Sequence, residues 1–214
     1  DNLRKSMSYI LAVHVPIAGM ALLPALFGMP AMLFPMHIAF LELIIDPACS
    51  IAFENEPAEA DIMRRPPRDP NVPLFGGMTF LLALLQGVGV LVVVMGAYIF
   101  AQQQLPEAEA RAFAFVTLVM SNLALIFSNR TRAHSLLASL RTPNPVLWGV
   151  TGVTLLILML SLYVPALSRL LRFAPLPFHE LVLALALGVA SVIWFQIIRM
   201  MMPGSAIRGG QLPA

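Results

Sequence analysis

The sequence has 214 residues, of which 59% are hydrophobic and 11% are charged, with a formal net charge of +2 and a mean hydropathy of +0.84. Soluble domains carry about 25% charged residues, so this composition excludes an ordinary soluble domain and predicts a protein whose solvent is lipid. The apolar residues come in long unbroken runs, which favours an all-α polytopic transmembrane bundle over a β-barrel.

Six segments are long and apolar enough to cross a bilayer, which takes about 20 residues of helix. In chain order, the expected spans cover residues 7–27, 33–53, 74–101, 112–128, 146–164 and 178–201. A tight turn at Gly28-Met29-Pro30 separates the first two, which are expected to form an antiparallel hairpin. The whole chain, 1–214, is thus expected to be one transmembrane domain with an Arg/Pro-rich cytoplasmic loop at 54–73 and a C-terminal tail at 203–214.

The basic residues predict the orientation of these spans. With the N-terminus in the cytoplasm, ten of the 13 Lys and Arg residues fall in inner segments, and only Arg111, Arg169 and Arg172 fall in outer ones. Basic residues concentrate on the cytoplasmic side of membrane proteins. We therefore expect a multi-pass protein of the cell membrane with both termini cytoplasmic and an even number of spans.

The second expected span carries Glu42 and Asp46, the only two carboxylates expected at membrane depth. They are four residues apart, which places both side chains on one helix face about 6 Å from each other. One acid at that depth costs roughly 2.5–3.5 kcal/mol, so a pair is expected to have a function, such as binding a hard cation or carrying protons. The alternative is a structural pair satisfied by polar groups of other helices. In either case, both side chains are expected to face other helices and not lipid.

Pro47 directly follows this pair and cannot donate a backbone hydrogen bond to the preceding turn. The carbonyl of residue 43 is thereby freed as a further ligand, and we expect the helix to lose regular hydrogen bonding over 45–49. Two more polar groups are candidate ligands: His14, held beside the acid pair by the hairpin, and Asn122 in the fourth span. A lone membrane His or Asn more often hydrogen-bonds to a neighbouring helix than binds an ion.

Some chemistry is excluded by the sequence. Lys5 is the only lysine, so there is no Gly-Lys-Ser/Thr loop to hold a phosphate. There is no Ser/His/Asp arrangement, and the expected inner loops are too short for a nucleotide-binding domain. The chain is not expected to hydrolyse ATP on its own or to bind nucleic acid.

Three stretches carry a resemblance to a known family: Leu33-Phe34-Pro35, Glu42-Leu43-Ile44-Ile45-Asp46, and Asp61-Ile62-Met63-Arg64-Arg65-Pro66-Pro67-Arg68. Together they resemble the C-terminal transmembrane domain of cation-transporting P-type ATPases, which calcium, sodium/potassium and proton/potassium pumps share. The resemblance implies that the six spans are helices five to ten of a pump. It also implies that the partners are the bilayer, the first four membrane helices and a cytoplasmic phosphorylation domain that uses Mg-ATP and contacts residues 54–73.

The resemblance also bears on the transported cation. Asp46 stands at the family's near-invariant aspartate, and Glu42 stands where calcium pumps have Asn and proton/potassium pumps have Glu. His14 falls on a position that is often an Asn ligand. Ile17 and Val119 replace glutamates of the calcium pumps, which argues against a two-calcium site and leaves one divalent ion, a monovalent ion or protons.

The expected function is therefore that of the ion-binding transmembrane half of an ATP-driven cation pump, with a site built on Glu42 and Asp46. One alternative is an independent six-helix secondary transporter or channel that uses the same two acids as a proton or cation relay. Another is a membrane scaffold without transport activity.

Overall fold

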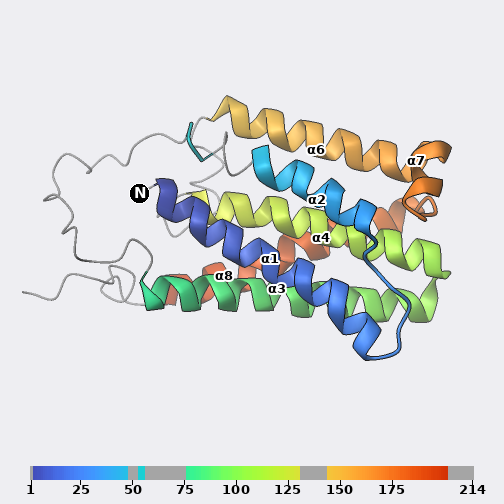
Figure 1. Cartoon of the computed structure of the whole chain (residues 1–214), viewed down its shortest axis with the longest axis horizontal. Helices are drawn as coiled ribbons and strands as arrows, with labels where there is room; N and C mark the ends of the chain where they lie inside the picture. Colours follow the sequence, from blue (N-terminus) through green and yellow to red (C-terminus); the bar gives the residue numbers. More distant parts are fainter. Residues whose placement is uncertain (1, 48–52, 56–75, 131–143, 202–214) are drawn as a thin grey trace, which may run out of the picture.

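The computed structural model describes residues 2–47, 53–55, 76–130 and 144–201, and all regular structure in this part of the chain is helical. The helices are α1 (Asn2–Leu26), α2 (Pro35–Pro47), α3 (Gly77–Gln104), α4 (Glu107–Arg130), α6 (Pro145–Tyr163), α7 (Pro165–Leu170) and α8 (Phe178–Met201). Figure 1 shows the long helices side by side with their axes roughly aligned. The expected all-α fold is thus confirmed.

Five of these helices, α1, α3, α4, α6 and α8, are long and apolar enough to cross a membrane. They correspond to five of the six expected spans. The fourth differs most, since α4 begins at Glu107, five residues before the expected start, and a Pro106 carbonyl already accepts a helical bond from Ala110. The expected loop at 54–73 lies outside the described residues except for 54 and 55, and the tail at 203–214 lies wholly outside them.

The second expected span is the exception, because α2 is a helix of 13 residues over the described part of the chain. At 1.5 Å per residue it is roughly 20 Å long, which is less than the bilayer core of about 30 Å. Residues 48–52, which follow it, lie outside the described residues. Residues 45–47 keep helical geometry, although Pro47 donates no bond, and the rest of the predicted break lies outside the described part.

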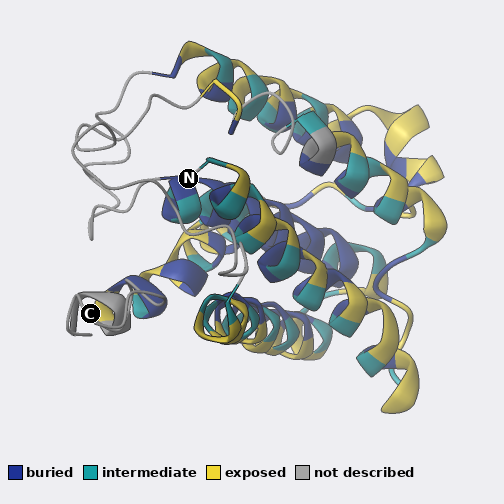
Figure 2. Ribbon diagram, turned by 60° about the vertical axis from the view of Figure 1, so that its left-hand side comes forward, coloured by how far each residue is buried: buried dark blue, intermediate teal, exposed yellow. Residues whose placement is uncertain are grey.

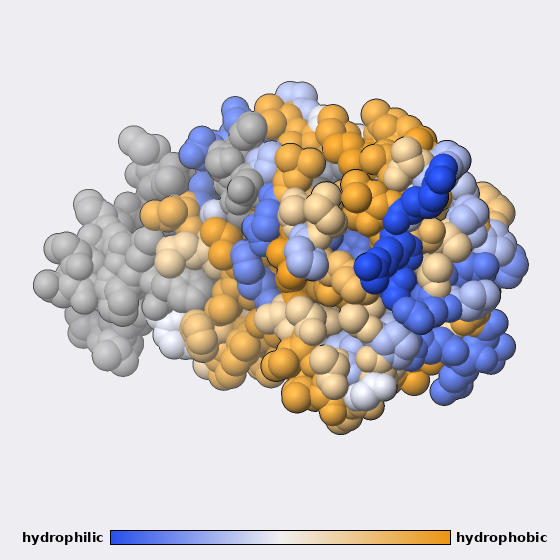
Figure 3. Space-filling view, turned by 45° about the vertical axis from the view of Figure 1, so that its right-hand side comes forward, coloured by the Kyte–Doolittle hydropathy of each residue, from blue (hydrophilic) through white to orange (hydrophobic). Residues whose placement is uncertain are grey.

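The central helix of the bundle is α4. In its most apolar stretch 83% of the residues are buried, against 39% or fewer in the other four candidate spans. It packs against α8, α3 and α1. Figure 2 shows the buried residues gathered inside the bundle and the exposed ones on the outer sides of its helices. Helices α1, α3 and α6 turn large apolar side chains outward, such as Leu22, Val92 and Leu156, each more than half exposed. Figure 3 shows hydrophobic side chains over most of one face and hydrophilic ones gathered at one end, as lipid contact demands.

Three helices are joined by a polar cluster inside this apolar bundle. Gln86 of α3 and Gln196 of α8 both donate a hydrogen bond to the hydroxyl of Ser128 on α4, and the Asn129 amide donates to the Gln86 side-chain oxygen at 3.1 Å. Interhelical hydrogen bonds of this kind hold membrane helices together where the hydrophobic effect cannot.

Two glycines allow helix backbones to approach closely. A Cβ atom on Gly87 of α3 would lie 2.6 Å from the carbonyl oxygen of Ala12 on α1, and one on Gly188 of α8 would lie 2.8 Å from the Thr117 carbonyl on α4. Backbone atoms cannot give way as a side chain can. These contacts are the small-residue packing that membrane helices use.

Gly87→Ala should therefore destabilise the protein by about 1–3 kcal/mol, the usual cost of overpacking. The matched control is Gly152→Ala on α6, where an added Cβ meets nothing within 4 Å. The midpoint of thermal unfolding in detergent compares the two. Equal unfolding midpoints of the two variants would mean that α1 can move away from α3 without a loss of stability.

Candidate ion-binding site

The hairpin of α1 and α2 brings together two of the residues expected at an ion site. Nε2 of His14 on α1 lies 3.7 Å from Oε1 of Glu42 on α2, which is within ion-pair distance but longer than a hydrogen bond. Two ligands held 2.3–2.6 Å from one cation and 90–100° apart lie roughly 3.3–4.0 Å from each other. The spacing of this pair thus fits either a direct ion pair or two ligands of a shared cation.

The tautomer of His14 is set by its own helix. Its Nδ1 lies 2.7 Å from the carbonyl oxygen of Ile10. A carbonyl can only accept, so Nδ1 carries a hydrogen and donates it. In the neutral ring, Nε2 is left with a lone pair directed to the side of Glu42, and in the protonated ring it becomes a second donor. The same atom can therefore act as a ligand or as a cation beside the carboxylate.

This pair is only half covered by the described helices. The His14 side chain is 48% exposed and that of Glu42 is 41% exposed. Glu42 was expected to face other helices, and among the described helices it does so only toward α1, where it contacts His14. Asp46 lies one turn further along α2, and its side chain lies outside the described part of the structure.

Asn122 is buried in α4, and neither atom of its amide has a hydrogen-bond partner among the described residues. Phe115, two helical turns before it, contacts the ring of Phe40 on α2 at 5.3 Å between centroids. Residues seven apart share a helix face, so Asn122 lies on the face of α4 that is turned to α2. The structure does not bring it into contact with His14 or Glu42.

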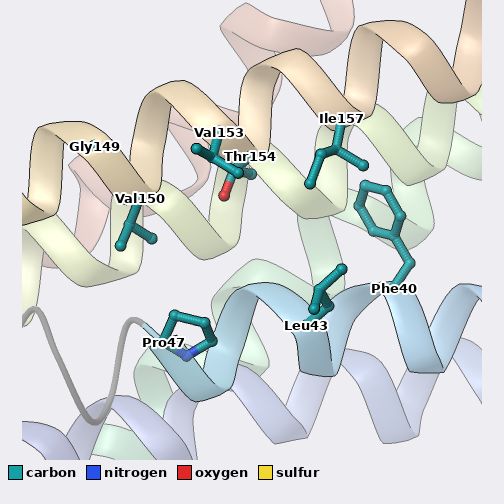
Figure 4. Close-up of a pocket in the computed structure, with 8 residues that line it drawn as sticks. All are labelled: Phe40, Leu43, Pro47, Gly149, Val150, Val153, Thr154 and Ile157. Carbon is teal, nitrogen blue, oxygen red and sulfur yellow. The ribbon is translucent and has the colours of Figure 1, made fainter.

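The described residues hold no group of three or more His, Cys, Asp or Glu side chains that could bind a metal. A cavity of about 260 Å³ lies between α2 and α6, and Thr154 is its only polar side chain (Figure 4). It is lined by Phe40, Leu43, Pro47, Gly149, Val150, Val153, Thr154 and Ile157. One hydroxyl among apolar groups cannot hold a cation. The candidate site is therefore the hairpin pair and not this cavity.

His37, near the start of α2, has a structural role that the sequence did not specify. Its Nε2 donates to the Leu171 carbonyl at 2.7 Å, and its Nδ1 accepts the backbone N–H of Phe34 at 3.0 Å. The ring is fully buried and stacks on Phe173 at 4.8 Å. Both ring nitrogens are used, so His37 joins the start of α2 to the α7–α8 connection and is not available as a ligand.

Five helices that are long and apolar enough to cross a membrane define a polytopic membrane protein. The chain belongs to the family described as "Cation transporting ATPase, C-terminus", whose model matches residues 30–201. It is 27% identical over 201 residues to a calcium-transporting ATPase of Listeria monocytogenes, a match that covers 93% of this chain and 22% of the relative.

Two further relatives are a second bacterial pump and a human one. A calcium-transporting ATPase of Bacillus subtilis is 28% identical over 170 residues, which are 78% of this chain and 19% of that protein. The sodium/potassium-transporting ATPase subunit alpha-4 of Homo sapiens is 27% identical over 217 residues, with 82% and 21% covered. The chain thus spans about a fifth of the length of these relatives. The resemblance to P-type cation pumps is confirmed.

Proposed function

We propose that this chain is the ion-binding transmembrane half of an ATP-driven cation pump, with the cation bound at the hairpin of α1 and α2. The observation that carries the proposal is the contact of His14 on α1 with Glu42 on α2. Asp46, one turn further along α2, adds a second carboxylate, and the unpartnered amide of Asn122 is a fourth candidate ligand. Carboxylate and amide oxygens suit a hard cation.

The rest of the pump is the proposed partner of this half. Two polar side chains left about half exposed at membrane depth are costly in lipid. Further membrane helices of the pump would cover them and supply more ligands. In this proposal the chain spans the cell membrane six times with both termini cytoplasmic. Mg-ATP acts in the cytoplasmic domains, and residues 54–73 contact the phosphorylation domain.

The test is cation-stimulated ATP hydrolysis by the full-length pump in membrane vesicles, with Ca²⁺, Mn²⁺, Na⁺ and K⁺ added separately across pH. At least one of them should stimulate hydrolysis and accumulate in the vesicles. Cation flux that needs no ATP would favour a secondary transporter instead.

His14→Ala should weaken the apparent affinity for the stimulating cation by up to about fivefold, because a neutral ring brings no charge to the cation and one such polar contact is worth about 1 kcal/mol. A matched control is His179→Ala, since the His179 side chain is 79% exposed and contacts only the neighbouring Glu180. An unchanged affinity in His14→Ala would remove His14 from the site.

A further inference from the structure

One buried guanidinium, that of Arg111, joins three segments of the chain. The side chain belongs to the second turn of α4, and the residue is only 4% exposed. Its Nε donates to the carbonyl of Ala31 in the α1–α2 connection at 3.1 Å, and its Nη1 donates to the carbonyl of Arg172 in the α7–α8 connection at 2.9 Å. Its Nη2 pairs with Glu107 of its own helix. From the sequence, Arg111 was expected in an outer segment, and none of these contacts was predicted.

The same guanidinium lies against the residue that precedes α2. Its central carbon is 5.1 Å from the centroid of the Phe34 ring, and that of Arg172 is 4.5 Å from the same ring. Both distances are within the range of a cation–π contact. Arg172 has a φ of 54°, in the left-handed region that residues other than glycine rarely adopt, and the bond from Arg111 to its carbonyl supports that conformation.

The start of α2 is therefore held by polar and aromatic contacts, whereas its other half is held by the apolar packing of Leu41 and Ile45. Phe34 is held by two guanidinium groups, and its backbone N–H bonds to His37, which is itself fixed to Leu171. Beyond Phe40, α2 borders the cavity of about 260 Å³ against α6 (Figure 4). On its cavity side the helix has room to shift, so its direction depends on its first turn as well as on the packing of Leu41 and Ile45.

Glu42 lies eight residues after Phe34, roughly 12 Å along the helix. A change in the direction of the first turn would therefore displace its carboxylate relative to His14 on α1. No contact between Arg111 and either residue of that pair is involved.

We propose that Arg111 is a positioning residue for the cation site: it sets the start of α2 and thereby the distance between Glu42 and His14. The inference rests on the proposed function of that pair. A merely structural Arg111 would change how much pump folds, whereas a positioning Arg111 changes the apparent cation affinity of the pump that has folded.

The experiment compares Arg111→Gln, Arg111→Lys and Glu42→Gln in the full-length pump, using whichever of Ca²⁺, Mn²⁺, Na⁺ and K⁺ stimulates the wild type. Arg111→Gln should weaken the apparent affinity between about twofold and thirtyfold, the range of couplings through a packed network. The maximal rate per phosphorylated pump should stay within about twofold. Arg111→Lys should be intermediate, because an ammonium cannot bond both carbonyls with the geometry of a fork.

The matched control is Arg169→Gln, an exposed arginine on α7 whose Nε bonds only to the carbonyl of Pro165 in its own helix. It should keep the wild-type affinity. If Arg111→Gln does not fold, Phe34→Leu removes the ring and leaves the guanidinium hydrogen bonds, and it should weaken the affinity in the same direction.

Two results would overturn the inference, and they differ in what else they overturn. Wild-type affinity in the Arg111 and Phe34 variants, with a weakened Glu42→Gln, removes the positioning role and leaves the proposed function intact. Wild-type affinity in all of them, Glu42→Gln included, removes the ion site itself and the positioning role with it.

Discussion

Asp46→Asn should abolish cation-stimulated phosphorylation of the full-length pump. The substitution keeps the size of the side chain and removes one unit of negative charge from the proposed ligand set. At 4 Å and an effective dielectric constant of about 20, that charge attracts a monovalent cation by about 4 kcal/mol, which corresponds to roughly a thousandfold in affinity. A divalent cation would lose about twice as much free energy. No usable cation concentration would then fill the site.

The measurement is the amount of phosphorylated protein formed from labelled ATP as the cation concentration rises. Asp46→Glu keeps the charge and should retain part of the response, and Glu109→Gln removes a charge near the start of α4, far along the chain from the acid pair. Normal cation-stimulated phosphorylation in Asp46→Asn would mean that the acid pair is structural and that the cation binds in another part of the pump.

Hydropathy and local signals were enough to predict much of this fold. Apolar runs of about 20 residues predicted five spans that the structure confirms, because burial in lipid depends on composition and length alone. The turn at 28–30 predicted the hairpin, and the hairpin predicted that His14 lies beside Glu42. This part of the site could be predicted since α1 and α2 are consecutive and joined by a short connection.

The contacts that fix α2 could not be predicted in this way. Arg111 reaches a carbonyl 80 residues away, and His37 reaches one 134 residues away. The hydrophobic periodicity of a sequence does not indicate which distant backbone carbonyl a buried side-chain donor will bond. Arg111 was therefore expected just outside the span that begins at residue 112, although its three polar contacts allow it to be buried in the second turn of α4.

Asn122 shows the opposite case. Its place in an apolar run suggested a hydrogen bond to another helix, yet its amide has no partner among the described residues and is nearly fully buried. An unpaired buried amide costs roughly 1–3 kcal/mol. A cation or water bound beside α2 would relieve that cost, which gives the residue a physical reason to belong to the proposed site.

Glu42→Gln should weaken the apparent cation affinity less than Asp46→Asn does, and it should also change how that affinity depends on pH. The Gln oxygen can still coordinate a cation, and Asp46 would keep its negative charge in the same ligand set. We therefore expect a loss of roughly five- to thirtyfold, corresponding to about 1–2 kcal/mol.

The pH effect follows from linkage. Protons compete with the cation for every group that must be deprotonated on binding, and here these groups are Glu42, Asp46 and His14. The slope of log affinity against pH counts the protons released. Removing one carboxylate that must lose its proton before the cation binds should lower that slope by up to one. Ion-stimulated ATP hydrolysis measured from acid to neutral pH gives both quantities for Glu42→Gln and for the wild type. A parallel shift with an unchanged slope would show that Glu42 releases no proton when the cation binds over this pH range.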